Sequence, residues 1–380
     1  MRRYKIGFLT SSDPLDKRKL SGINYHILQA VQQNLGDTEL LGPIKSRSIL
    51  NGFLKRIGKK FNKSYNIDHS IFMAILYARI FNKRLKDKQF DLIIAPRSST
   101  EIAFIKTKIP ILYYSDTTFA SLYNYYEWFS NFMSISVWEG NFIEKRALRK
   151  AHWVVFTSQW AADSAVNDYQ TDPSKIHLIP FGANLNEVPS RELVLRQKPF
   201  DICKLLFLGV EWERKGGEIA FETFKILKNS GLKTTLTVCG CIPPRHIVDE
   251  DMEVIPYINK NNFDEYKKFE QILLQHHFLI LPTRAECFGV VFCEASAYGL
   301  PSITTDTGGV GGVVVNGING YRLPLNAQSK TYAEKIMSIW SDFNGKYTPL
   351  AVSTRDYFEQ TLNWDVFTEK VRSIIERNQI

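Results

Sequence analysis

The sequence contains few cysteines and no pattern that pairs them. Five occur among its 380 residues, and none belongs to a CxxC motif. Cys239 and Cys241 stand closest together, but no His or Cys lies beside them at the spacing of a zinc site. We therefore expect reduced thiols and a cytoplasmic location rather than a disulfide framework or a zinc site.

Long apolar runs are also missing. No stretch approaches the roughly 20 apolar residues that span a bilayer. The opening MRRYKIGFLTSS is basic and then apolar, but IGFL is shorter than the about 7–15 residues of a signal-peptide core, so we expect a first β-strand there. Hydrophobic residues make up 44% and charged residues 23%, which is typical of a soluble protein. The length suits two domains of roughly 100–200 residues each.

Two common nucleotide-binding motifs are absent. The loop after the first expected strand, TSSDPLDKRKLSG, lacks the GxGxxG of NAD-dependent oxidoreductases. The basic loop Arg214-Lys215-Gly216-Gly217 also follows an expected strand, but no Ser or Thr comes after its lysine as in a P-loop ATPase. Both enzyme classes are therefore disfavoured.

Positive charge is in excess and is unevenly distributed. The net charge of +9 comes from the first half of the chain, residues 1–190, whereas the second half is close to neutral. A positive first half predicts an anionic partner such as a phospholipid surface, an acidic glycan or a nucleic acid.

Short apolar segments alternate with helical patterns, including a long one at 127–151. This alternation predicts βαβ units and parallel sheets covered on both faces. A polar, proline-containing connection near 183–200 separates two Rossmann-like lobes, and the ligand site is expected in the cleft between them, at the carboxyl ends of the strands. The expected strands are 4–11, 91–96, 111–116, 153–158 and 176–182, then 203–210, 234–240, 252–258, 277–283, 301–306 and 320–325.

The segment 282–301, PTRAECFGVVFCEASAYGLP, places two glutamates around a Phe-Gly turn. Phe288-Gly289 ends a strand and starts a helix, whose first N–H groups and partial positive charge suit a diphosphate. Gly289 lets the backbone approach such a ligand. Because a phosphate repels a carboxylate, we expect Glu286 and Glu294 to bind neutral hydroxyls on either side of it. Alternatively, Glu286 only favours the helix N-terminus and Glu294 is an exposed helix residue.

The basic loop at 214–217 offers a second contact for phosphate. Arg214 supplies a planar guanidinium and Lys215 a mobile ammonium, and both suit phosphate oxygens. The alternative is a solvated charged loop before a helix. A glycine-rich turn, TDTGGVGGVV at 305–314, follows another strand, and by itself it is a weak signal.

Together these motifs resemble glycosyltransferase family 4, the retaining glycosyltransferases of the GT-B fold. The resemblance rests mainly on the Glu-seven-Glu motif in its Phe-Gly context, and it is strongest over about residues 150–325. It also includes Gly22, Arg214-Lys215-Gly216, Asp306 to Gly309 and NGINGY at 316–321.

The resemblance implies an α/β GT-B fold, with two doubly wound Rossmann-like lobes facing each other across a cleft. It implies an N-terminal acceptor domain at 1–188, a C-terminal donor domain at 189–355, and a C-terminal helix at 356–380 that packs back on the first domain. The implied reaction moves a hexose from a nucleotide-diphosphate sugar, with retention at the anomeric carbon and without a metal or other cofactor.

The family pattern also implies roles for single residues. Glu286 would contact the donor sugar, and Glu294 would hold the nucleotide ribose. Arg214 and Lys215 would neutralise the diphosphate leaving group, an electrostatic effect that is commonly a large part of catalysis. Backbone N–H groups near Gly22 and Phe288-Gly289 would complete the donor site.

Two positions depart from the family pattern. Many relatives have an arginine after the glycine that ends the second lobe's first strand, but here Val210 follows Gly209, so Arg214 is our candidate partner of Lys215. Many relatives also carry a first-lobe histidine near the donor sugar. The corresponding strand end reads YYSDTTFAS, which makes Asp116 the candidate catalytic residue. An N-cap of the following helix is an equal alternative for Asp116.

Residues 45–63, KSRSILNGFLKRIGKKFNK, have the composition of a basic amphipathic helix. We expect peripheral contact with an anionic membrane, on the inner face of the plasma membrane, and packing on the first lobe is the alternative. Two alternatives stay open for the aromatic segment 119–129: it forms a wall of the acceptor site, or it lies in the core.

The resemblance thus favours a bacterial enzyme that moves a sugar to a saccharide or lipid-linked acceptor, in cell-surface polysaccharide or glycolipid synthesis. Two alternatives stay open: a sugar-nucleotide epimerase of the same fold, and a non-enzymatic basic protein that binds membrane or nucleic acid. The latter leaves Arg214, Lys215 and both glutamates without a role, so no nucleic-acid partner is expected.

Overall fold

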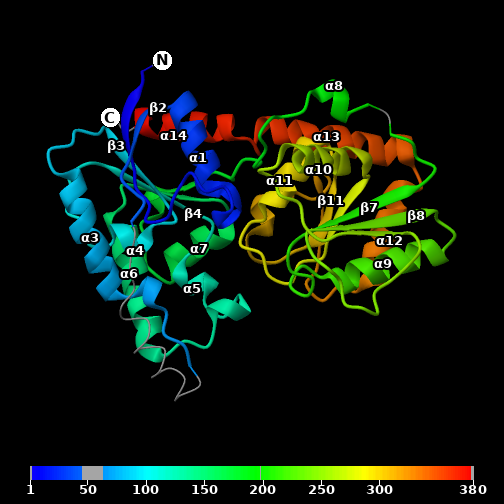
Figure 1. Ribbon diagram of the computed structural model, residues 1–380, viewed down its shortest axis with the longest axis horizontal. Helices are drawn as coiled ribbons and strands as arrows, with labels where there is room; N and C mark the ends of the chain where they lie inside the picture. The colour runs from blue at the N-terminus through cyan, green and yellow to red at the C-terminus, as the bar shows by residue number, and fades with distance from the viewer. Residues whose placement is uncertain (1, 45–62, 197, 378–380) are drawn as a thin grey trace. The chain divides into compact units, whose positions relative to one another are not determined.

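The chain forms two compact units (Figure 1). Unit 1 comprises Met1–Pro180 and Phe367–Ile380, and unit 2 comprises Phe181–Val366. The computed structural model describes residues 2–44, 63–196 and 198–377. The basic amphipathic helix expected at 45–63 therefore lies, apart from Lys63, outside the described residues.

Unit 1 is built on six parallel strands: β1 (Tyr4–Phe8), β2 (Gly36–Leu40), β3 (Leu92–Pro96), β4 (Ile111–Ser115), β5 (Trp153–Phe156) and β6 (Ile176–Leu178). Their order in the sheet is β2-β1-β3-β4-β5-β6. Strands β3, β4 and β5 are buried along their whole length, as expected for a parallel sheet with helices on both faces. Strand β2 was missed from the sequence, because GDTEL lies at the sheet edge and has no apolar run.

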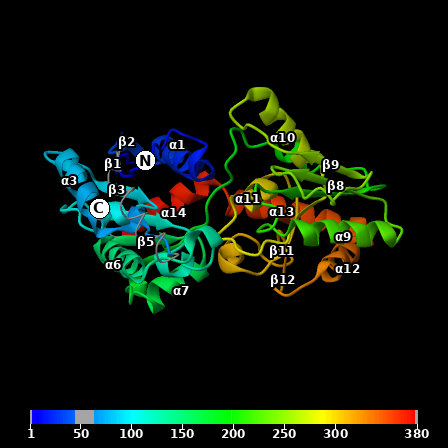
Figure 2. The ribbon, with the colours of Figure 1, turned by 60° about the horizontal axis from the view of Figure 1, so that its bottom comes forward.

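Helices cover both faces of this sheet (Figures 1 and 2). They are α1 (Ile23–Asn34), α3 (Ile71–Leu85), α4 (Ser99–Ile102), α5 (Phe119–Leu122), α6 (Ser134–Lys150), α7 (Gln159–Asn167) and α14 (Trp364–Arg377). Residues of α3, α6 and α7 share one hydrophobic core with the strands. The helix expected at 127–151 is shorter than expected. Residues 127–129 form a separate 3₁₀ turn and Asn131 has a positive φ of 55°, so α6 begins only at Ser134.

Unit 2 has a second sheet of six parallel strands, in the order β12-β11-β10-β7-β8-β9. They are β7 (Cys203–Leu208), β8 (Thr234–Cys239), β9 (Met252–Ile255), β10 (Phe278–Leu281), β11 (Ser302–Thr305) and β12 (Gly320–Leu323). The helices are α8 (Arg191–Val194), α9 (Gly217–Asn229), α10 (Phe263–Gln275), α11 (Val290–Ala297), α12 (Ser329–Trp340) and α13 (Thr348–Gln360). Helices α9 and α12 contact each other on one face, and α10, α11 and α13 cover the other (Figure 1). The two sheets confirm the predicted pair of Rossmann-like lobes.

The last segment is two helices, α13 and α14, rather than one helix over 356–380, and most of α14 belongs to unit 1, as predicted for the C-terminal helix. Asn363 separates them. Its amide donates to two carbonyls at the end of α13, at 2.9 and 2.8 Å, and its Oδ1 accepts from the N–H of Val366 at 2.9 Å. Helix α14 is tied to unit 1 by Arg372, which donates to the carbonyls of Arg2 and Asn34 at 2.8 and 2.6 Å.

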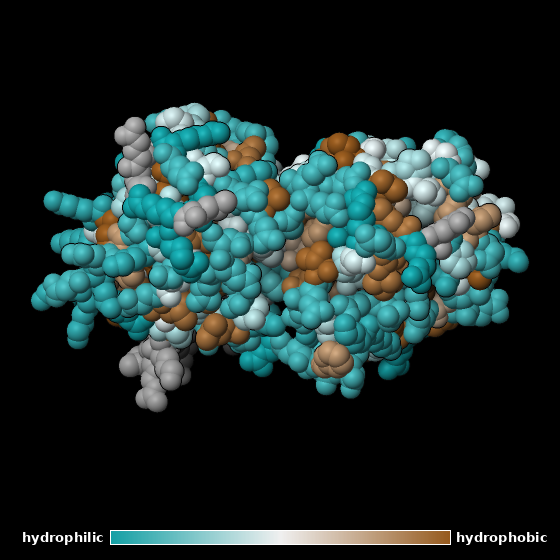
Figure 3. Space-filling model, turned by 90° about the horizontal axis from the view of Figure 1, so that it is seen from above, coloured by the Kyte–Doolittle hydropathy of each residue, from teal (hydrophilic) through white to brown (hydrophobic). Residues whose placement is uncertain are grey.

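The surface is mostly hydrophilic on the face shown in Figure 3, where hydrophobic residues form small groups. Within the ranges that the structure describes, no helix combines the length and the apolar character needed to cross a membrane. Exposed large hydrophobic side chains occur on both units, for example Phe72, Trp138 and Phe263.

Candidate functional site

The loop between β7 and α9 lies directly against the end of β10, and two glycines make this possible. A Cβ atom at Gly216, whose φ is 74°, would lie 2.0 Å from the carbonyl oxygen of Pro282. A Cβ atom at Gly217 would lie 2.1 Å from the ring of Trp212. A side chain at either position would push the loop away from the sheet. The two glycines thus hold Lys215 at the carboxyl end of the strands.

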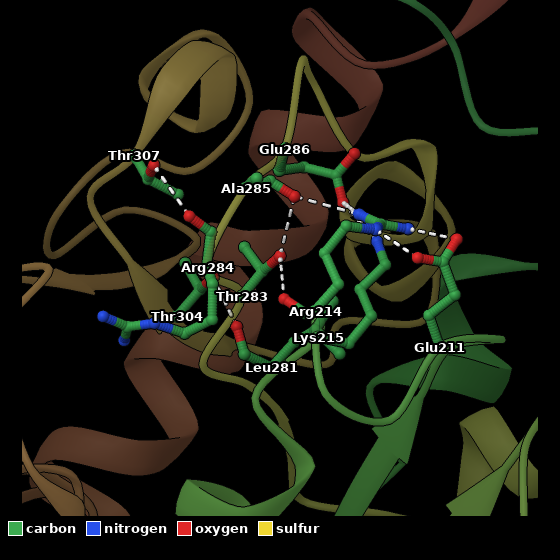
Figure 4. Close-up of polar contacts among 10 residues, drawn as sticks. All are labelled: Glu211, Arg214, Lys215, Leu281, Thr283, Arg284, Ala285, Glu286, Thr304 and Thr307. Carbon is green, nitrogen blue, oxygen red and sulfur yellow. Dashed lines mark hydrogen bonds and ion pairs between the residues drawn. The ribbon is translucent and has the colours of Figure 1, made fainter. Parts of the chain in front are cut away.

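Lys215 forms an ion pair with Glu286 at this corner of unit 2 (Figure 4). Both residues are only 8% exposed. Nη1 of Arg214 lies 3.7 Å from the same carboxylate oxygen. The solvated loop considered as an alternative for 214–217 is therefore wrong for Lys215, whose buried ammonium has a carboxylate partner.

Arg214 is held in one orientation by two further groups (Figure 4). Its Nε and Nη2 donate to the two carboxylate oxygens of Glu211, at 2.7 and 3.1 Å. Its Nη1 donates to the carbonyl of Ala285 at 2.9 Å. The hydrogen bonds from Arg214 lower the pKa of Glu211. The guanidinium is thus fixed by a bidentate pair, the most directional form of such a contact.

Three loops meet at Glu286. The carbonyl of Arg214 accepts from the N–H of Arg284 at 2.7 Å, which joins the loop after β7 to the loop after β10. The carbonyl of Glu286 accepts from the N–H of Gly309 at 3.0 Å, in the glycine-rich turn after β11. Because β7, β10 and β11 are neighbours in the sheet, these loops converge at its carboxyl edge, where sheets of this type bind ligands.

Helix α11 starts at Gly289, beside Glu286. Gly289 has a φ of 89°, and no side chain caps the first turn. A Cβ atom here would lie 2.6 Å from the ring of Phe292 and 3.2 Å from Cγ of Glu286. Phe288 is buried and packs edge-on against Phe181, with ring centres 5.3 Å apart. A ligand at this helix end would therefore contact the backbone of Phe288-Gly289 rather than a side chain.

Glu294, on the same helix, is also buried, with 5% exposure. Both of its carboxylate oxygens accept from the ammonium of Lys260, at 2.8 and 2.9 Å. The same ammonium lies 4.0 Å from the ring centre of Phe269. The alternative of an exposed helix residue is therefore wrong for Glu294.

Unit 1 carries the other two candidates, Gly22 and Asp116. Gly22 has a φ of 78° and immediately precedes α1. Asp116 follows β4 and is 7% exposed, and its Oδ2 lies 3.4 Å from Nη1 of Arg97. Its Oδ1 is buried and has no hydrogen-bond partner in the described part of the chain. The N-cap alternative for Asp116 is wrong, because Thr118 caps α5.

The aromatic segment 119–129 is partly buried. Phe119, Tyr126 and Phe129 are buried, whereas Trp128 is 65% exposed. The core alternative therefore applies to the buried residues, and the acceptor wall stays a prediction for the others.

The structure adds three residues that the sequence did not identify: Arg97, Glu211 and Lys260. Arg97 could be found from the sequence because it directly follows an apolar strand. Glu211 could be found because it precedes Arg214 by three residues. Lys260 stands in a polar loop without a motif. The structure thus brings Arg214, Lys215 and Glu286 together in unit 2, and the roles of all these residues stay predictions.

Two family models match the chain, one in each half. The model for Glycosyltransferase Family 4 matches residues 47–187. The model for Glycosyl transferases group 1 matches residues 203–342. By these two matches the chain is a family 4-like glycosyltransferase.

Relatives of this chain differ widely from it in sequence. The capsular polysaccharide biosynthesis glycosyltransferase CapM of Staphylococcus aureus is 26% identical over 252 residues, which are 61% of this chain and 63% of CapM. The chain spans about half of the length of the curated relatives it matches.

Solved structures confirm the predicted GT-B fold. Sucrose-phosphate synthase from Thermosynechococcus elongatus has a TM-score of 0.66 and 17% identity, and the match covers 99% of both chains. HepE of Anabaena, solved in complex with UDP-glucose, has a TM-score of 0.63 and 15% identity, over 99% of this chain and 100% of HepE. At such identities the likeness concerns the fold alone.

Proposed function

We propose that this chain moves a hexose from a nucleotide-diphosphate sugar to a saccharide or lipid-linked acceptor, with retention at the anomeric carbon. The observation that carries the proposal is the buried contact between Lys215 and Glu286, with Arg214 beside it. The match to the family 4 model and a fold neighbour that was solved with UDP-glucose support a nucleotide-sugar donor.

Arg214 and Lys215 supply the charge that a diphosphate requires. Both come from one loop, and the N-terminus of α11 beside them adds partial positive charge. Negative charge develops on the leaving diphosphate as the bond to the sugar breaks. Fixed positive groups that are shielded from water stabilise such charge strongly. Because these groups take the place of a metal ion, we propose that transfer needs no metal.

Glu286 and the donor would compete for Lys215. We propose that the diphosphate takes over the ammonium, while the carboxylate turns to hydroxyls of the donor sugar. The ammonium then keeps an anionic partner throughout, which avoids the large cost of an unpaired buried charge. The carboxylate meets neutral hydroxyls and avoids the phosphate.

Glu294 is proposed to hold the nucleotide ribose. Its two oxygens contact Lys260, whose side chain is 40% exposed and can therefore move into solvent. Two ribose hydroxyls would replace the two hydrogen bonds that the ammonium donates. Lys260 thus stabilises the buried carboxylate until the donor binds.

Asp116 is proposed to bind a sugar hydroxyl in place of the family's first-lobe histidine. Its buried Oδ1 lacks a hydrogen bond, and leaving such an acceptor unsatisfied is costly. Arg97 contacts the other oxygen and places a positive charge beside the carboxylate. A sugar hydroxyl that donates a hydrogen bond to Oδ1 would supply the partner that this oxygen lacks.

The biological setting follows from the relatives. CapM is named for capsular polysaccharide biosynthesis, and we propose a similar setting for this chain: bacterial cell-surface polysaccharide or glycolipid synthesis. The enzyme would act in the cytoplasm, at the inner face of the plasma membrane.

The proposal is tested by donor binding and turnover in the presence of EDTA. UDP, GDP, ADP and their hexose derivatives are screened by thermal shift, because a ligand that binds only the native state raises the melting temperature. The sugar nucleotides that bind are then assayed for release of nucleoside diphosphate with saccharide acceptors. We expect one nucleotide series to stabilise the protein and release to persist in EDTA. No stabilisation by any series would contradict the donor assignment. Retention is checked by the anomeric coupling constant of the product in proton NMR.

A further inference from the structure

Five exposed apolar side chains lie along α3 and α6 of unit 1, and we call them the apolar face. On α3, Phe72 and Ile75 are 53% and 38% exposed. On α6, Ile135, Trp138 and Phe142 are 51%, 55% and 36% exposed. Spacings of three and four residues put each set on one side of its helix. Single exposed hydrophobic residues are ordinary, but a group of this size marks an interaction surface.

The two helices run side by side in the same direction. Near their N-terminal ends, the N–H of Ile71 donates to Glu139 at 3.3 Å. Toward their C-terminal ends, Asn82 of α3 and Lys150 of α6 both bond to the loop 106–107, at 2.7 and 3.2 Å. The apolar face therefore occupies the N-terminal halves of both helices, on neighbouring positions.

Aromatic stacking makes the α6 part of the apolar face rigid. The rings of Trp138 and Phe142 stack with their centres 5.5 Å apart and an angle of 11° between their planes. The guanidinium of Arg146 lies 4.3 Å from the ring centre of Phe104 and 5.7 Å from that of Phe142. The amphipathic indole ring of an exposed tryptophan such as Trp138 is typical of the membrane–water interface.

Basic residues follow the apolar face toward the C-terminal ends of α3 and α6, on the same sides of the two helices. On α3, Arg79 and Lys83 are exposed, and on α6, Arg146 and Arg149 are exposed. The acidic residue among the apolar positions of α6, Glu139, is turned inward, where it accepts hydrogen bonds from Tyr65 and Ile71. Each helix thus presents apolar residues followed by cations.

We propose that the apolar face docks on an anionic lipid surface, with its rings among the headgroups and the four cations on lipid phosphates. Apolar burial joined to electrostatic attraction is the basis of peripheral membrane binding. A lipid surface fits better than a second copy of the chain, because the four cations beside the apolar residues call for anionic partners that a second apolar face does not supply. The proposal does not depend on the sugar transfer proposed above or on residues 45–62.

The docked surface would lie at the end of unit 1 that carries Asp116. Gly140 of α6 packs so closely on Phe119 that a Cβ atom there would lie 2.2 Å from the ring. Phe119 comes three residues after Asp116, at the carboxyl end of β4. A lipid-linked substrate held in the membrane would therefore reach the carboxyl end of this sheet, where Asp116 lies.

The test is sedimentation of the full chain with vesicles of phosphatidylcholine, with and without phosphatidylglycerol. We expect binding to the anionic vesicles and much less to the neutral ones. The double variant Trp138→Ser/Phe142→Ser and the charge variant Arg146→Gln/Arg149→Gln should each weaken binding by at least about tenfold, the equivalent of about 1.4 kcal/mol. Phe263→Ser is the control, because Phe263 is a still more exposed aromatic residue, on α10 of unit 2.

Three results would overturn the proposal: equal binding to neutral vesicles, wild-type binding by both double variants, or a dimer in solution that the Trp138→Ser/Phe142→Ser variant loses. If that variant melts below the wild type, Phe72→Ser and Ile135→Ser replace it, one on each helix. No activity is measured, so failure here is separate from failure of the proposed function.

Discussion

The ammonium group of Lys215 and the carboxylate of Glu286 form a buried ion pair, although 71 residues separate them in sequence. Burial removes both charges from water, so each depends on the other for its stability in the fold. Arg214 lies 3.7 Å from the same carboxylate. The pair joins the basic loop after β7 to the first glutamate of the Glu-seven-Glu motif.

Replacing Lys215 or Glu286 alone should lower the free energy of unfolding by more than half of the loss that follows when both are replaced. Lys215→Met and Glu286→Gln are each expected to lower the free energy of unfolding by on the order of 3 kcal/mol, because each removes the closest opposite charge from a buried charged group. The double variant should lose clearly less than the sum of the two. Urea unfolding of the four proteins measures the difference. Strictly additive losses would show that the two groups do not interact.

Glu211 should act on the donor through Arg214. Glu211→Gln removes the charge that holds the guanidinium, and we expect the donor KM to rise about fivefold with kcat little changed, since a partly exposed pair contributes about 1 kcal/mol. Glu213→Gln changes an exposed glutamate of the same loop and serves as the control. Steady-state kinetics with varied donor separates KM from kcat. An equal effect of both substitutions would remove Glu211 from this role.

Gly216 should tolerate no side chain. Gly216→Ala would place a Cβ atom 2.0 Å from a backbone oxygen, so the loop must shift, at a cost of about 1–3 kcal/mol beyond that of the positive φ. Gly231 has a similar φ of 89°, but nothing lies within 4 Å of its Cβ position. Gly231→Ala should therefore cost only the conformational part, about 1–2 kcal/mol. Thermal unfolding of both variants checks the difference, and similar losses would contradict it.

Unit 2 should lose stability as the pH falls from about 6.5. Burial lowers the pKa of His277 to about 3, and the neutral ring accepts from the N–H of Lys204 and donates to the carbonyl of Pro199. Below its unfolded pKa of about 6.5, only the unfolded state takes up this proton, so stability falls with pH until about pH 3. His277 alone should account for about 2 kcal/mol between pH 7 and pH 5. Urea unfolding at both pH values should show a smaller loss for His277→Gln, and an equal loss would contradict the assignment.

The sequence predicted those features that rest on local patterns. Strands β3 to β5 follow from their apolar runs, and the turns at Gly216 and Gly289 follow from glycine at a strand end. Strand β2 could not be predicted in this way, because an edge strand with polar residues leaves no apolar run. The break at Asn363 was missed because an apolar pattern continues on both sides of it.

Contacts between distant residues were the least predictable part of the site. Lys260 and Glu294 are 34 residues apart, and Arg97 and Asp116 are 19 apart. No periodicity connects such pairs, and they meet only because the sheet order places their loops at one edge. The sequence indicated that the carboxylates need partners, and only the fold shows which cations supply them.

The most direct test of the donor site is isothermal titration calorimetry with the nucleoside diphosphate that stabilises the protein best. Wild type, Lys215→Met and Lys233→Met are compared, the last being an exposed lysine elsewhere in unit 2. Lys215→Met should bind about 10–100-fold more weakly, since it loses a charge-assisted contact to phosphate, whereas Lys233→Met should bind like the wild type. Equal affinity of Lys215→Met and wild type would contradict a diphosphate site at Arg214 and Lys215.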